Sequence, residues 1–259
     1  MPDPTAPLIV DRDDRGVLRL TLNRPASRNA LSRELLTCLA AALDSVDATT
    51  RVVVLAANGV AFSAGHDLRE VGSADEASAR SLFELCTSVM LRIRRLPVPV
   101  IAAVQGAAVA AGCQLAATAD LAIAADSAIF GTPGVKVGLF CATPMVPLAR
   151  AVPPKVALEL LLTGGTLTAR RAFDLGLVNR VVPGDRLEEA VEEMVVAILS
   201  AAPGAVRAGK AAYYETIDMG EVEAYAHATA QIACDAGGAE AREGIAAFLE
   251  KRRPCWPVS

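Results

Sequence analysis

The stretch VQGAAVAAGCQL, residues 104–115, decides the fold class of this chain. It begins at the end of the apolar run VPVIAAV (98–104), which predicts a buried strand, and its small residues predict a tight turn that leads into a short helix. An earlier stretch, AFSAGHDL (61–68), follows the β-branched run VVVLA (52–56), which is also typical of a buried strand. Strands that alternate with helices predict parallel βαβ units.

Both stretches can present backbone amides to a bound ligand. Small side chains let a ligand approach the backbone closely, and the free N–H groups at a helix start carry partial positive charge. Two such amides directed at one point form an oxyanion hole, where each donor stabilises a transition state by about 3 kcal/mol. Two ordinary strand-to-helix turns fit the same pattern, so the residues alone leave both interpretations open.

Toward the N-terminus, the runs LIVD (8–11) and VLRLTL (17–22) are separated by Asp13, Asp14, Arg15 and Gly16, which predicts a hairpin. Ser32 can cap a helix that runs to about residue 47. We expect a loop over 57–72, a long helix over 73–95 and a third strand over 121–124.

From residue 144 onward the pattern becomes helical. Prolines and glycines separate the predicted helices, and one more strand is expected over 177–182. The predicted helices span 145–151, 154–162, 168–175, 187–201, 204–216, 220–235 and 240–251. We therefore expect an α/β core over 1–190 and a helical C-terminal region over 191–259.

Composition excludes several classes of protein. The chain has 259 residues, with 25 Lys and Arg against 29 Asp and Glu, so its formal net charge is −4. Apolar residues make up 53%, which excludes disorder as the main state. Nucleic-acid binding through bulk charge needs a basic protein, so no nucleic-acid partner is expected.

Location and metal content can also be predicted. No apolar run approaches the roughly 20 residues of a membrane span, and the N-terminus lacks the pattern of a signal peptide. The six cysteines show no paired spacing, which favours free thiols in a reducing compartment. We therefore expect a cytoplasmic protein without a membrane partner. Its two histidines, His66 and His227, lie far apart in sequence, so no metal site is expected.

Motifs along the whole chain resemble the crotonase superfamily, the enoyl-CoA hydratase/isomerase family. They occur in the family's order, which is far more specific than any single motif. The matching stretches are LNRP (22–25), NAL (29–31), FSAGHDL (62–68), PVIAAVQG (99–106), AGC (111–113), LLTG (161–164), 172–182, EG (243–244) and AFLEKR (247–252).

The resemblance implies a crotonase-like (ClpP/crotonase) α/β spiral of ββα units with a C-terminal helical region for trimerisation. It implies an acyl-CoA thioester as ligand and no cofactor beyond the coenzyme A of the substrate. It also implies a homotrimer or a dimer of trimers.

The resemblance further implies a set of site residues. The thioester oxygen would lie between the backbone N–H groups of His66 and Ala111. Coenzyme A would lie along Arg28, Ala64, His66, Asp67 and Leu68, and Phe248 and Lys251 would reach the nucleotide of a neighbouring subunit. An ammonium such as that of Lys251 is a suitable partner for phosphate.

This sequence departs from the family's hydratases at both catalytic glutamates. Gln114 and Gly134 stand in their places. Hydration needs a base that activates water and an acid that delivers a proton, and each carboxylate typically contributes 10²–10⁴-fold. Gln114 can hold a water by hydrogen bonds but cannot take its proton. We therefore expect ordinary hydratase activity to be impaired and the pair of amides to remain able to stabilise an enolate.

Three functions stay open for such a chain. Stretches 63–68, 110–115 and 132–141 are similar to the enoyl-CoA hydratase domain-containing protein 3 group, which lacks the same glutamates. On this similarity the chain is nominally an enoyl-CoA hydratase, a lyase of fatty-acid and acyl-CoA metabolism. Stretch 62–67 is also similar to methylmalonyl-CoA decarboxylases, although these carry a tyrosine where this chain has Cys141. A non-catalytic acyl-CoA binder or regulator is the third possibility.

Other polar residues have a functional and a structural interpretation. His66 could transfer a proton through its ring, or only its amide could matter; Gln114 could orient water or satisfy buried backbone. We favour a structural role for Asp67, which can cap the turn of its own segment. The same preference applies to five further residues: Cys113 and Cys141 as apolar fillers, Lys136 as a loop charge, and Glu70 and Glu84 as helix-surface carboxylates.

Overall fold

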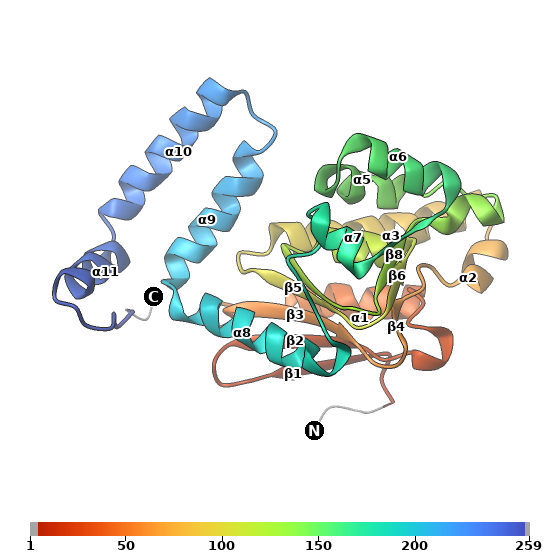
Figure 1. Cartoon of the computed structure of the whole chain (residues 1–259), viewed down its shortest axis with the longest axis horizontal. Helices are drawn as coiled ribbons and strands as arrows, with labels where there is room; N and C mark the ends of the chain where they lie inside the picture. The colour runs from red at the N-terminus through yellow and green to blue at the C-terminus, as the bar shows by residue number, and fades with distance from the viewer. Residues whose placement is uncertain (1–4, 257–259) are drawn as a thin grey trace.

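The computed structural model describes residues 5–256, and its strands form two sheets (Figure 1). The larger sheet has the order β1-β2-β3-β5-β7-β10, and the smaller one has the order β4-β6-β8-β9. The strands are β1 (Leu8–Arg12), β2 (Val17–Leu22), β3 (Val52–Ala57), β4 (Ala61–Ser63), β5 (Val100–Val104), β6 (Ala107–Val109), β7 (Leu121–Ala125), β8 (Ile129–Gly131), β9 (Thr166–Thr168) and β10 (Arg180–Val182).

The larger sheet confirms the predicted hairpin and the predicted parallel core. Strands β1 and β2 are antiparallel, with Leu8 opposite Leu22, and a turn that contains Gly16 at φ +86° joins them. The neighbouring pairs from β2 to β10 are all parallel. Every one of these parallel strands except β10 is largely buried, as expected for a sheet covered on both faces.

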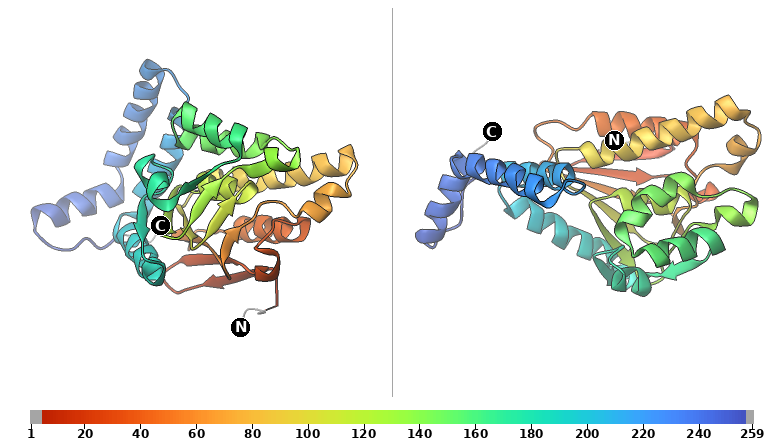
Figure 2. Two further views of the ribbon diagram at one scale, coloured as in Figure 1. Left: turned by 45° about the vertical axis from the view of Figure 1, so that its right-hand side comes forward. Right: turned by 90° about the horizontal axis from the view of Figure 1, so that it is seen from above.

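Helices cover both faces of the larger sheet (Figure 2). Alternate residues of β3 point to opposite sides: Val53 and Leu55 belong to the main core with α1 and α3, whereas Val52 and Val54 pack with α8. The helices are α1 (Arg33–Asp44), α2 (Leu68–Gly72), α3 (Glu76–Arg95), α4 (Ala111–Thr118), α5 (Ala142–Ala151), α6 (Pro154–Thr163), α7 (Ala169–Asp174), α8 (Leu187–Ser200), α9 (Pro203–Thr216), α10 (Glu221–Ala236) and α11 (Ala239–Leu249).

The predicted capping of α1 is confirmed, because the Ser32 hydroxyl accepts from the Leu35 amide. Short 3₁₀ helices form at Pro25–Ser27, Pro133–Val137 and Gly184–Arg186. The predicted loop over 57–72 was wrong in part, since it contains strand β4 and helix α2. The cause is length: three-residue strands and a five-residue helix are too short to show a period in the sequence.

Helices α9, α10 and α11 extend away from the sheets (Figures 1 and 2). The segment after α11 turns back, and the Trp256 indole donates to the Ser200 carbonyl at 3.0 Å. The division of the chain at residue 190 stays a prediction. Helix α8 spans that boundary, and beyond it Val191 and Val195 are still buried against the larger sheet.

Membrane-spanning helices and clusters of metal ligands can be searched for in the described part of the chain. Among residues 5–256 no helix is long and apolar enough to cross a bilayer. Over the same range, no group of three or more potential metal ligands lies together. The six cysteines lie within it and are all free thiols.

Candidate functional site

The two small-residue stretches lie side by side. Strands β4 and β6 are parallel neighbours, with Ser63 opposite Ala108, so the turns that follow them leave the same edge of the smaller sheet. A Cβ on Gly65 would lie 2.7 Å from the Ala110 Cβ and 3.2 Å from the Ala111 nitrogen. The two backbones therefore touch where the sequence places the oxyanion hole.

The amides of these two turns are free to bind a ligand. Ala111 is the first residue of α4, where an N–H has no acceptor within the helix. In the described part of the chain, the His66 N–H likewise donates to no backbone carbonyl, whereas the Gly65 carbonyl before it accepts from Leu31. Two unpaired donors on touching segments are the feature that an oxyanion requires.

Ala110 directs the second amide through a strained backbone. It has φ +51° and ψ −121°, a conformation that residues with a Cβ rarely adopt. Strain of this kind costs about 1–3 kcal/mol and persists where the surrounding structure enforces it. Here the Ala110 amide donates to the Gly131 carbonyl at 2.9 Å, which ties the turn to the end of β8.

The variant Ala110→Gly is expected to raise the free energy of unfolding by about 0.5–1 kcal/mol. Glycine adopts this φ without steric cost, and this gain exceeds the added entropy of the unfolded chain. Chemical denaturation of both proteins measures the difference. A loss of stability in Ala110→Gly would show that the turn is not strained.

The structure places Gln114 in the first turn of α4, buried to 3% exposure. Its backbone N–H donates to the Ala110 carbonyl, so it continues the turn that presents the Ala111 amide. Its side-chain Oε1 is buried and has no hydrogen-bond partner among the described residues. A buried amide oxygen without a partner is costly, which favours a ligand-facing role over the satisfaction of backbone.

Gly134 is enclosed by backbone. A Cβ at this position would lie 2.3 Å from the Leu139 carbonyl oxygen and 2.7 Å from the Cys141 Sγ. The Leu139 amide donates to the Gly134 carbonyl at 2.9 Å, which holds the loop against it. The chain therefore lacks a glutamate here and has also filled the space that its side chain needs.

The His66 ring is half-buried behind the turn. Its Nδ1 lies 3.3 Å from the Leu31 carbonyl, and its Nε2 has no partner among the described residues. The ring packs edge-on against Phe83, with 5.1 Å between centroids. Burial lowers the pKa of His66, so the ring is neutral at pH 7. Both interpretations of this ring remain compatible with its position.

Other predicted ligand residues divide into two groups in space. Arg28 and Ala64 are joined by a hydrogen bond from the Ala64 amide to the Arg28 carbonyl, and Arg28 has φ +52°. Asp67 caps α2 and pairs with Arg24 at 3.3 Å, which agrees with a structural role, and Leu68 beside it is exposed.

Phe248 and Lys251 do not join this group. They lie on and just after α11, at the end of the molecule opposite α2 (Figure 1). Phe248 is 82% exposed, and Lys251 follows the helix at φ +56°. Within one chain these two residues cannot complete the site around His66.

The remaining candidates have ordinary structural surroundings. Cys113 is fully buried, and burial raises its pKa to about 12, as expected for a filler. The Lys136 side chain covers Gly164. The Glu70 carboxylate accepts from the Arg33 amide at 2.9 Å, whereas Glu84 is exposed on α3.

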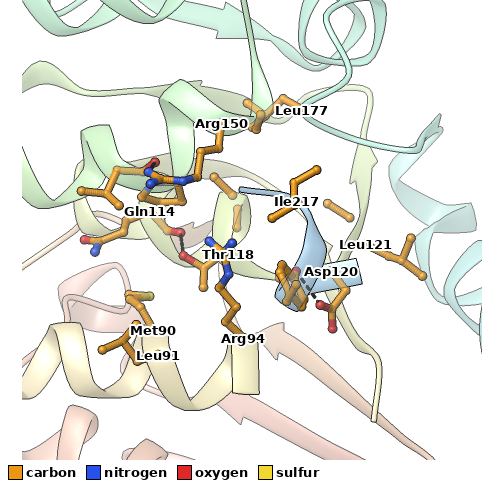
Figure 3. Close-up of a pocket in the computed structure, with 18 of the residues that line it drawn as sticks. Met90, Leu91, Arg94, Gln114, Thr118, Asp120, Leu121, Arg150, Leu177 and Ile217 are labelled. Atoms are coloured by element: carbon orange, nitrogen blue, oxygen red, sulfur yellow. Dashed lines mark hydrogen bonds between the residues drawn. The ribbon is translucent and has the colours of Figure 1, made fainter. Parts of the chain in front are cut away.

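A cavity of about 780 Å³ was missed by sequence reasoning. It lies between α3, α4, α5 and α9, and Gln114 contributes to its lining (Figure 3). Its wall includes Arg94, Asp120, Arg150 and Lys210. These residues are spread over more than a hundred positions, so no local pattern in the sequence could have indicated the cavity.

Comparisons with known proteins agree with this architecture. The family model described as enoyl-CoA hydratase/isomerase matches residues 12–258. Enoyl-CoA hydratase domain-containing protein 3, mitochondrial, of Homo sapiens is 41% identical over 258 residues, which cover 98% of this chain and 84% of that protein. The 2,3-dehydroadipyl-CoA hydratase of Escherichia coli is 35% identical over 250 residues, which cover 95% of this chain and 97% of that protein.

Solved structures confirm the crotonase-like fold. The crystal structure of an enoyl-CoA hydratase from Mycobacterium smegmatis has a TM-score of 0.95 at 49% identity, over 96% of this chain and 98% of that chain. The human enoyl-CoA hydratase domain-containing protein 3 has a TM-score of 0.92 at 41% identity, over 96% and 100%. This chain belongs to the enoyl-CoA hydratase/isomerase family.

Proposed function

We propose that this chain binds acyl-CoA thioesters and stabilises a thioester enolate between the N–H groups of His66 and Ala111. The observation that carries the proposal is the close approach of Gly65 to the Ala110–Ala111 turn, beside two N–H groups that have no backbone acceptor among the described residues. Arg28, Ala64, Asp67 and Leu68 adjoin these amides and are the proposed path of coenzyme A. No further cofactor is proposed.

We propose a lyase other than an ordinary hydratase. Hydration needs a base and an acid on the substrate, and neither Gln114 nor Gly134 supplies one. Amide donors without either carboxylate suit a reaction that makes less demand on a base, such as decarboxylation of a malonyl-type thioester. There the electrons of the breaking C–C bond move to the α-carbon, CO₂ leaves, the enolate oxygen is held by the two amides, and water supplies the proton. A non-catalytic acyl-CoA binder is the alternative.

We further propose a homotrimer or a dimer of trimers, without a nucleic-acid or membrane partner and located in the cytoplasm. Helices α10 and α11 expose large apolar side chains that a monomer leaves in water. These are Val222, Tyr225, Ile232, Ile245, Phe248 and Leu249. In such an assembly Phe248 and Lys251 would reach the nucleotide of a neighbouring subunit.

The test combines turnover with binding. Hydration of crotonyl-CoA is monitored as a decrease in the absorbance of its conjugated thioester. Binding of butyryl-CoA is measured by calorimetry on the same sample. We expect binding, together with hydration at least about 10²-fold slower than that of a family hydratase with both glutamates. Release of CO₂ from methylmalonyl-CoA would support the decarboxylase, and its absence with binding intact would support the binder.

Two outcomes contradict the proposal. Hydration at the rate of a glutamate-bearing hydratase would show that another group replaces the missing carboxylates. Absence of any thioester binding would remove the acyl-CoA function altogether.

A further inference from the structure

The cavity beside the proposed thioester site extends along α4. The helix lines it from Gln114 to Thr118, and Asp120 follows (Figure 3). Gln114 lies three residues after Ala111, which is about 4.5 Å along the helix axis. The cavity therefore begins within one helical turn of the amide that is proposed to hold the thioester oxygen.

Two guanidinium groups enter this cavity without a carboxylate partner. Arg94 comes from α3 and Arg150 from α5, on opposite sides of Thr118 (Figure 3). Arg94 stacks on the Tyr214 ring at 4.6 Å, and Arg150 donates to the Val146 carbonyl of its own helix at 2.9 Å. Neither pairs with a carboxylate of residues 5–256, although a guanidinium offers five donors.

The other charges of the cavity wall form no ion pair with these two arginines. Lys210 donates to Asp120 at 2.7 Å, and Asp120 also accepts from the Tyr214 hydroxyl, so this carboxylate is already paired. Asp218 also lines the cavity and forms no ion pair with any described residue. Three cationic groups therefore face two carboxylates, so the wall carries a net charge of +1, and neither arginine is held in an ion pair with a described residue.

Apolar side chains from three segments, several of them partly exposed, form a surface of the wall that suits an acyl chain. Met90 and Leu91 from α3, Val146 and Pro147 from α5 and Ile217 after α9 contribute carbon surface. The apolar side chains and the two arginines together suit a ligand that has an apolar chain and an anionic end. A guanidinium matches the geometry of a carboxylate and can bind it through two parallel hydrogen bonds.

We infer that the cavity receives the far end of the acyl group and that Arg94 and Arg150 bind a carboxylate there. The preferred substrates are then CoA thioesters of dicarboxylic acids. This inference rests on the proposed function, because the thioester must first be held at His66 and Ala111. It assigns to the two arginines a role in specificity and leaves the amides to hold the reacting group.

Calorimetry with two matched pairs of thioesters tests the inference. Glutaryl-CoA is compared with pentanoyl-CoA, and adipyl-CoA with hexanoyl-CoA, because each pair differs only in the terminal carboxylate. We expect each thioester with a terminal carboxylate to bind at least about tenfold more tightly than its methyl-ended counterpart. A difference of this size corresponds to one charge-assisted hydrogen bond. Arg94→Gln and Arg150→Gln should each remove most of that preference and leave the methyl-ended thioesters within about twofold of wild type.

Arg95→Gln is the matched control. Arg95 follows Arg94 on α3, is exposed and is not part of the cavity wall, so its loss removes the same charge without the contact. Equal affinities within both pairs, a preference that survives both cavity variants, or an equal loss in Arg95→Gln would each overturn the inference while acyl-CoA binding stands. Absence of binding by all four thioesters would overturn the proposed function and the inference together.

Discussion

Replacing Lys210 with methionine is expected to lower the free energy of unfolding by about 3–5 kcal/mol, because it leaves the Asp120 carboxylate buried without its cation. The side chains of Lys210 and Asp120 are only 7% and 13% exposed. The Lys210 ammonium donates to Asp120 at 2.7 Å and to the carbonyls of Ile93 and Val98 at 3.0 and 2.9 Å. One side chain of α9 thus satisfies acceptors from three other segments.

The lysine also holds the C-terminal helices in place. Asp120 accepts from the Val100 amide and the Tyr214 hydroxyl, both at 2.7 Å, so the same carboxylate joins β5 to α9. Urea denaturation measures the loss, and Lys155→Met, at an exposed position of α6, is the control. We expect Asp120→Asn in the Lys210→Met background to recover part of the stability, because it removes the unpaired charge. A loss below about 1 kcal/mol in Lys210→Met would show that the ion pair is not buried in solution.

The variant Gly112→Ala is expected to lower the free energy of unfolding by about 3 kcal/mol and to weaken thioester binding. A Cβ on Gly112 would lie 2.2 Å from the Ser63 carbonyl oxygen and 2.8 Å from the Ser63 Cβ. Ser63 cannot move aside easily, since its hydroxyl donates to the Asn29 carbonyl at 2.9 Å. Helix α4 must therefore shift away from β4, and the Ala111 amide shifts with it.

Gly209→Ala provides the opposite result within the same chain. Gly209 lies inside α9, and a Cβ at this position would have open space within 4 Å, so alanine adds helix propensity without a clash. This variant should gain about 0.5–1 kcal/mol and leave thioester affinity unchanged. If Gly112→Ala behaves like Gly209→Ala in denaturation and calorimetry, α4 does not pack against β4 as closely as the structure shows.

Local patterns predicted the elements whose evidence lies within a few neighbouring residues. The hairpin followed from the polar residues between two apolar runs, and the start of α1 followed from Ser32. The order of motifs along the whole chain predicted the crotonase-like fold. Proteins of one family share long-range contacts, and no single local pattern reveals these contacts. Strands β4, β6, β8 and β9 were missed because three residues cannot display an alternation.

The sequence predicted only those features of the candidate site that depend on the residue type at a single position. The resemblance assigns the positions of the family's two glutamates to Gln114 and Gly134, and the residue types there could be read directly from the sequence. The closed space around Gly134 could not, because it depends on where the Leu139 carbonyl folds back. The pairing of Lys210 with Asp120 joins residues 90 positions apart, and only the position of α9 beside the loop between α4 and β7 brings them together.

The pairing of β4 with β6 has a consequence for the chemistry of the site. Neighbouring strands lie about 4.7–4.9 Å apart, and a hydrogen bond from nitrogen to oxygen spans about 2.9 Å. Two amides that leave adjacent parallel strands in the same direction are therefore spaced so that one oxygen can accept from both. Under the proposed function, the sheet repeat sets the spacing of the two segments that carry the donors, so this spacing persists when the surrounding acids and bases are exchanged. Under the proposed function, a scaffold of this kind can change its reaction and still bind the thioester.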